Sequence, residues 1–136
     1  MRYLLASIVF LMAGCGTGHV LRIMSAPEVK VGENFDLTVG KVVRIEGQTS
    51  HVYFASVLED SRCPMNARCI WEGNAKIAVQ LGSLSAPTFE LNTSERFATR
   101  GGLFDHDIVL VHLEPTPMTG EKIKKYVATL RVEVRP

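Results

Sequence analysis

Tyr126-Val127-Ala128-Thr129-Leu130-Arg131-Val132-Glu133-Val134 is the stretch that decides the fold. Every second residue from Tyr126 to Val134 is apolar, and Thr129, Arg131 and Glu133 stand between them, with Val127 as the one break. An alternation of period two is typical of a strand that turns one face to a core and the other to solvent. The stretch therefore predicts a β-strand and points to an all-β fold.

Six further segments show strand-like patterns: Phe35–Val39, Lys41–Ile45, His51–Leu58, Ala75–Leu81, Thr88–Leu91 and Ile108–Leu113. His51–Leu58 is apolar on both faces, which predicts a central, buried strand. Turn signals separate the segments, among them residues 46–48, 82–83 and 100–102. About seven short strands predict an antiparallel, Ig-like β-sandwich with one short disulfide-closed loop, and a small β-barrel is the alternative.

The N-terminus has the build of a secretory signal. Arg2 precedes an uncharged apolar run that ends at Gly14, directly before Cys15. The run is too short to span a bilayer, which takes roughly 20 apolar residues. Small residues followed by a cysteine resemble the lipobox of bacterial lipoproteins, although Met12 stands where that family usually has Leu. The resemblance implies that Cys15 carries lipid.

That resemblance also implies a division of the chain and a location. Residues 1–14 are expected to be removed as the signal peptide, residues 15–27 to form a lipidated tether, and residues 28–136 to form the sandwich domain. The membrane is then a partner through the lipid on Cys15. Asp is absent after that cysteine, since Gly16 stands there. In a Gram-negative source this implies the periplasmic face of the outer membrane.

Charge balance excludes some partners. The chain has 15 Lys and Arg residues and 14 Asp and Glu residues, and Arg2 would leave with the signal. A neutral domain lacks the electrostatic footprint of a nucleic-acid-binding protein. It also lacks the polybasic patch that binds anionic lipid.

The three cysteines of the chain are expected to have two different roles. Cys15 takes the lipid, which leaves Cys63 and Cys69 as an even pair in an oxidising compartment. Such a pair predicts a disulfide. The closed loop is short, so its contribution to stability is expected to be only about 2 kcal/mol.

Residues 59–73 read Glu-Asp-Ser-Arg-Cys-Pro-Met-Asn-Ala-Arg-Cys-Ile-Trp-Glu-Gly and hold the chain's single Trp. The series Asp-Ser-Arg-Cys-Pro followed by Cys-x-Trp-x-Gly resembles a motif of small bacterial envelope lipoproteins that have no assigned activity. The resemblance implies a fold and a location but no reaction.

The motif has a structural and a functional interpretation. Structurally, Asp60 starts the turn, Arg62 pairs with Asp60 or Glu59, Trp71 covers the disulfide, and Gly73 supplies a positive φ. Functionally, the closed ring presents a rigid recognition loop, which lowers the entropy lost on binding. The candidate recognition residues are Asp60, Arg62, Met65, Asn66, Arg68 and Trp71. A protease-inhibitor-like sandwich is a further alternative.

Asp105-His106-Asp107 is the one carboxylate–imidazole cluster. It is either a polar turn or the centre of a metal-binding protein or metal-dependent enzyme. No nucleophile elbow, phosphate loop or zinc helix occurs in the sequence. We therefore expect a non-enzymatic, lipid-anchored cell-envelope module without catalytic residues or cofactor. Its partner would be an envelope protein or glycan, and the sequence leaves its oligomeric state open.

Overall fold

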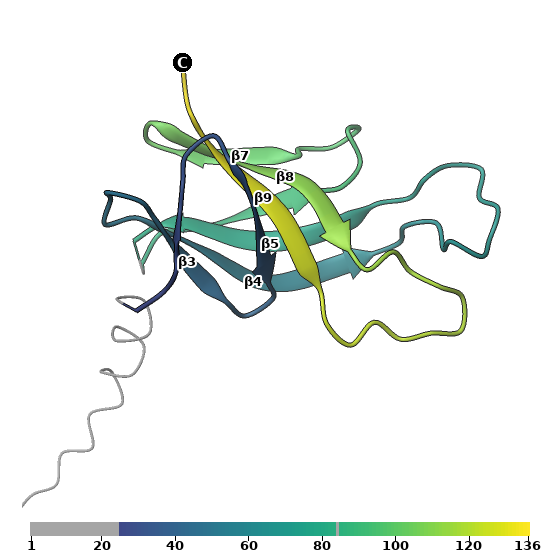
Figure 1. The fold of residues 1–136 in the computed structure, drawn as a ribbon. Coiled ribbons are helices and arrows are strands. Elements are labelled where there is room, and N and C mark those ends of the chain that lie inside the picture. The colour runs from purple at the N-terminus through teal and green to yellow at the C-terminus, as the bar shows by residue number, and fades with distance from the viewer. Residues whose placement is uncertain (1–24, 84) are drawn as a thin grey trace, which may run out of the picture.

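The computed structural model describes residues 25–83 and 85–136, which contain nine strands and no helix (Figure 1). The strands form two sheets, in the orders β1-β3-β4-β5-β6 and β2-β9-β8-β7. In chain order they are β1 Glu28–Val29, β2 Asn34–Thr38, β3 Val42–Ile45, β4 His51–Asp60, β5 Ala75–Gly82, β6 Thr88–Asn92, β7 Arg100–Leu103, β8 His106–Glu114 and β9 Val127–Val134. The predicted all-β sandwich is confirmed. Both described sheets are open, so the alternative of a small barrel is wrong.

The alternating stretch Tyr126–Val134 supplies β9, which lies between β2 and β8 in the smaller sheet. Ala128, Leu130 and Val132 are fully buried, and the intervening residues face outward, as the alternation predicts. All pairs in this sheet are antiparallel. In the larger sheet the pairs are antiparallel except for β1 and β3, which run parallel.

The central position predicted for His51–Leu58 is also confirmed. β4 lies between β3 and β5, and Val52 and Phe54 on it are fully buried. The shared core lies between the two sheets and includes Ile77 of β5 and Leu91 of β6. The register of β4 against β5 shifts twice, the second time between Val57 and Glu59. A bulge of this kind re-aims the side chains that follow it.

Two strands, β1 and β7, were not predicted from the sequence. β1 has only two residues, too few to show a pattern. The expected turn at Arg100-Gly101-Gly102 is wrong, because these residues belong to β7. Gly101 lies so close to Phe89 that an added Cβ would stand 2.9 Å from the Phe89 side chain. The glycine here permits close packing within a strand instead of a turn.

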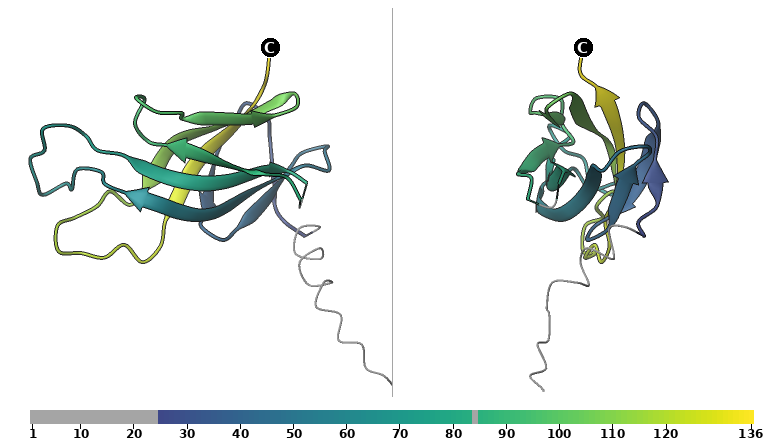
Figure 2. Two further views of the ribbon diagram at one scale, coloured as in Figure 1. Left: turned by 180° about the vertical axis from the view of Figure 1, so that it is seen from behind. Right: turned by 90° about the vertical axis from the view of Figure 1, so that its left-hand side faces the viewer.

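Two long connections between strands extend from one end of the sandwich. We call residues 61–74, between β4 and β5, the disulfide loop, and residues 115–126, between β8 and β9, the partner loop. Both extend from the same end (Figures 1 and 2). The described chain begins near the other end, where the Pro27 carbonyl accepts a hydrogen bond from the Arg44 N–H. The end that carries the two loops is called the distal end.

The predicted signal peptide (residues 1–14), the lipidation site Cys15 and most of the tether (residues 15–27) lie outside the described residues. The described part contains no helix of a length and hydropathy suited to crossing a membrane.

Candidate functional site

The disulfide loop is closed by the predicted bond between Cys63 and Cys69, whose Cα atoms are 5.9 Å apart. Its base continues the β4–β5 hairpin, because the Ser61 N–H donates to the Asn74 carbonyl at 2.7 Å. The ring between the cysteines exposes its side chains, and Met65 is 73% exposed. The disulfide loop thus continues the hairpin beyond the strands and exposes its tip to solvent (Figure 1).

Arg62 joins the disulfide loop to the partner loop. Its guanidinium donates to both carboxylate oxygens of Asp60, at 2.8 and 2.7 Å, so of the two predicted partners Asp60 is the one that it binds. It also donates to the carbonyls of Leu113, at 2.5 Å, and Pro115, at 2.8 Å. The Asp60 and Arg62 side chains are only 9% and 11% exposed. These two residues of the predicted recognition loop therefore act mainly inside the protein.

Two further bonds tie the loops together nearer their tips. The Met65 N–H donates to the Pro117 carbonyl at 2.9 Å, and the Thr119 N–H donates to Asn66 Oδ1 at 2.8 Å. Asn66 thus fixes the partner loop, whereas the Met65 side chain stays exposed, as does Arg68. The disulfide loop and the partner loop are thus joined by hydrogen bonds into one surface, which we call the braced surface. It contains residues from both segments of the sequence.

The electrostatics of the brace depend on Asp60. Burial on its own would raise the pKa of Asp60, but the hydrogen bonds and charge of Arg62 outweigh it and hold the pKa below its ordinary value. The Tyr126 hydroxyl donates to Asp60 Oδ2 at 3.1 Å. Burial and the nearby Asp60 carboxylate raise the pKa of Tyr126. The carboxylate is thus charged and hydrogen-bonded at neutral pH.

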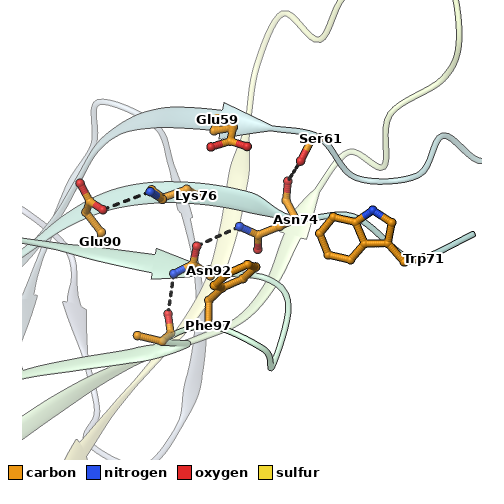
Figure 3. A pocket seen from close by; sticks show the side chains of 9 residues that line it. Glu59, Ser61, Trp71, Asn74, Lys76, Glu90, Asn92 and Phe97 are labelled. Carbon is orange, nitrogen blue, oxygen red and sulfur yellow. Dashed lines mark hydrogen bonds and ion pairs between the residues drawn. The ribbon is translucent and has the colours of Figure 1, made fainter. Parts of the chain in front are cut away.

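A cleft of about 540 Å³ lies beside the disulfide loop (Figure 3). Trp71 of that loop and Phe97 of the turn between β6 and β7 (residues 93–99) contribute aromatic rings, which are 41% and 51% exposed. Charged side chains line the rest of the cleft on the outer face of the larger sheet. They are Glu59 of β4, Lys76 of β5 and Glu90 of β6.

Two buried amides form the floor of the cleft. Asn74 Nδ2 donates to Asn92 Oδ1 at 2.9 Å, and Asn92 Nδ2 donates to the Ala98 carbonyl at 2.9 Å. Asn74 Oδ1 accepts from the Ser94 N–H at 3.1 Å. The amides thus bind the disulfide loop, β6 and the β6–β7 turn to one another. Because their hydrogen bonds are satisfied internally, they give the cleft a fixed shape.

Trp71 departs from its predicted role. The sequence interpretation had this ring bury a large area over the disulfide, but more than a third of the residue is exposed. Its ring lines the cleft, and the Arg96 guanidinium lies 5.4 Å from the ring centroid. A cation at that distance is attracted by the ring quadrupole and restrains the indole.

The cluster Asp105-His106-Asp107 lies at the other end of the sandwich and is divided between a turn and β8. His106 Nδ1 and Asp105 Oδ1 are 2.8 Å apart, and this hydrogen bond lowers the pKa of Asp105. Asp107 instead accepts from Arg135 at 2.6 Å, and Arg100 lies 3.7 Å away. In residues 25–83 and 85–136 no three His, Cys, Asp or Glu side chains are arranged to hold a metal ion.

Sequence reasoning found the disulfide loop but missed the cleft. Glu59, Lys76, Glu90 and Phe97 come from three strands and a turn, and no spacing in the sequence joins them. Comparisons with family models, with curated proteins and with solved structures found no match.

Proposed function

We propose that this chain is a non-enzymatic binding module, lipid-anchored in the bacterial cell envelope, which contacts another envelope component through its distal end. The observation that supports the proposal is the braced surface of the disulfide and partner loops. Arg62, Met65 and Asn66 join the two loops through hydrogen bonds of 2.8–2.9 Å. A surface that is already ordered loses little entropy when a partner binds.

Exposed apolar side chains on this surface support a contact role. Met65, Ile70 and Trp71 of the disulfide loop and Met118 of the partner loop are all exposed. Large apolar side chains gathered on one surface are typical of interaction sites. Methionine and tryptophan are also enriched at interfaces between proteins.

The anchor belongs to the proposal because of the sequence before Cys15. Each buried methylene of an acyl chain contributes about 0.8 kcal/mol, and two or three chains make release from a membrane slow. The described chain begins near the end of the sandwich opposite the two loops (Figure 2). An anchor that precedes it would leave the distal end directed away from the membrane.

The anchor has a direct test. Replacement Cys15→Ser should move the protein from the detergent phase to the aqueous phase when cells expressing it are extracted and phase-separated. Mass spectrometry of the wild-type protein should find acyl chains on that residue. A variant that stays in the detergent phase contradicts the lipid anchor.

The binding role is tested by crosslinking in intact envelopes. The wild-type protein should give a crosslinked product that is lost in the double variant Met65→Ala/Arg68→Ala. Both side chains are exposed, so the variant should fold normally. The matched control is Phe104→Ala, an exposed residue at the other end, which should keep the product. Unchanged crosslinking in the double variant contradicts the role of the loop surface.

A further inference from the structure

We propose that the cleft beside Trp71 binds a short oligosaccharide of pyranose sugars. Trp71 and Phe97 would stack on the sugar rings, and Glu59 would accept hydrogen bonds from their hydroxyls. The inference rests on the binding role proposed for the distal end and names the chemical class of one ligand. It concerns the cleft, not the exposed tip of the disulfide loop.

The size and the aromatic rings of the cleft support this class. Its volume of about 540 Å³ lies within the range of about 300–1,000 Å³ that small-molecule sites occupy. The exposed faces of Trp71 and Phe97 carry partial negative charge, which suits the weakly positive C–H groups on one face of a pyranose ring. Arg96 restrains the indole, so little side-chain entropy is lost when a sugar stacks on it.

The polar groups suit hydroxyls. The Glu59 carboxylate has no hydrogen-bond or ion-pair partner in the part of the chain that the structure describes, and Figure 3 shows it beside the cleft. A free carboxylate accepts two or more hydrogen bonds, and those it accepts are stronger than neutral ones. Lys76, which is paired with Glu90 at 3.4 Å, adds ammonium donors in the same cleft. The hydroxyls of a sugar can donate hydrogen bonds to the carboxylate and accept them from the ammonium group.

A cationic peptide is the main competitor, because a cleft lined by a carboxylate and aromatic rings also suits an ammonium or guanidinium group. Two cations of the protein already occupy this region. Lys76 lines the cleft, and Arg96 lies over the Trp71 ring. Their charges oppose those of Glu59 and Glu90, so the cleft has little net field to attract a cation. A neutral saccharide needs no such field.

The experiment uses a favourable property of the chain: Trp71 is its only tryptophan, so fluorescence excited where the three tyrosines absorb little reports on the surroundings of this one ring, which lines the cleft. The full chain in detergent is titrated with chitotriose and maltotriose. Two further arms, soluble peptidoglycan fragments and delipidated lipopolysaccharide core, distinguish the sources of such a sugar. We expect a saturable change in emission with a Kd on the order of 0.1–1 mM for at least one saccharide.

Variants locate the binding. Phe97→Ala and Glu59→Gln should each weaken it by about tenfold, the fold-change for a stacking contact or a charged hydrogen bond. Phe104→Ala and Glu46→Gln, exposed residues at the other end, are the matched controls and should leave the Kd unchanged. Thermal unfolding of each variant shows whether the protein is still folded.

Three results overturn the inference. They are the lack of a saturable response to all four saccharide samples, an equal weakening by the control variants, or a response to a lysine-containing peptide alone. If crosslinking still depends on Met65 and Arg68 while no saccharide binds, the inference fails and the proposed function stands. If a saccharide binds but no crosslink depends on these two residues, the contact role proposed for the loop surface is wrong and the inference about the cleft stands.

Discussion

Replacement Arg62→Met tests the brace between the two loops. The guanidinium makes four side-chain hydrogen bonds, two to Asp60 and one each to the Leu113 and Pro115 carbonyls. Methionine keeps the apolar stem but leaves the Asp60 carboxylate, which is 9% exposed, without its cation. Removal of one partner from a buried ion pair costs about 3–5 kcal/mol. We expect a loss of this size in the free energy of unfolding at neutral pH.

The pH dependence of that loss has a defined sign. In the wild type the pKa of Asp60 is lowered from 3.8, so the stability it contributes is complete above that value and is lost as the pH falls below it. In the variant burial acts without the guanidinium and raises the pKa of Asp60. The unpaired charge then destabilises the fold at neutral pH and disappears on protonation. The difference between the two proteins should therefore shrink from about pH 7 to about pH 4.

Urea unfolding followed by circular dichroism, with the disulfide intact, measures both quantities. The control is Arg100→Met, whose side chain is 55% exposed although it pairs with Glu133 at 3.2 Å. An exposed pair contributes at most about 1 kcal/mol. A loss below about 1 kcal/mol for Arg62→Met at neutral pH, or a loss that grows on acidification, refutes the reasoning.

Two further substitutions examine the disulfide loop. Gly73→Ala should cost about 2–5 kcal/mol in urea unfolding, because φ is 73° and the new Cβ would clash with the Ser61 carbonyl oxygen. Gly120→Ala, also at positive φ but in open space, should cost only about 1–2 kcal/mol, and equal losses would argue against the clash. Replacement of both Cys63 and Cys69 by Ala should cost about 2 kcal/mol and leave the β-sheet circular dichroism spectrum unchanged. Loss of the whole spectrum at 25 °C would show that the ring supports the entire domain.

The sheets were predictable because burial imposes a local pattern on each strand. The alternation at Ala128, Leu130 and Val132 and the two-sided apolar run of β4 both follow from where these strands lie. β7 was missed because Gly101 serves a contact with Phe89, a residue in another strand. A glycine read from the sequence gives no sign of whether it supplies a turn or room for a neighbour.

The cleft illustrates a different limit. Glu59 lies on the outer face of β4, as alternation counted from the buried Val52 and Phe54 predicts, because the second register shift of this strand restores the period that the first one interrupts. What places Glu59 beside Lys76 is the pairing of β4 with β5. A single strand's sequence does not encode that pairing.

The Asp60–Arg62 pair was predictable because its two residues are separated by one position. The other half of the brace was not, because Arg62 reaches the Leu113 and Pro115 carbonyls more than fifty residues away. Backbone carbonyls carry no sequence signal, so a guanidinium that binds them looks like an ordinary surface arginine. The motif therefore showed that the disulfide loop was ordered, but not what held it.

The antiparallel order of the strands explains why the parts of the site meet. β4 ends at Asp60 opposite Ala75, the start of β5, and Lys76 of β5 lies opposite Asn92, the end of β6. The disulfide loop and the β6–β7 turn therefore both leave the larger sheet at the distal end of its strands. There Trp71 and Phe97 line a common cleft. β9 begins at that same end, so the partner loop comes within reach of Arg62. A surface built this way needs no residue from the opposite end of the sandwich, near which the described chain begins.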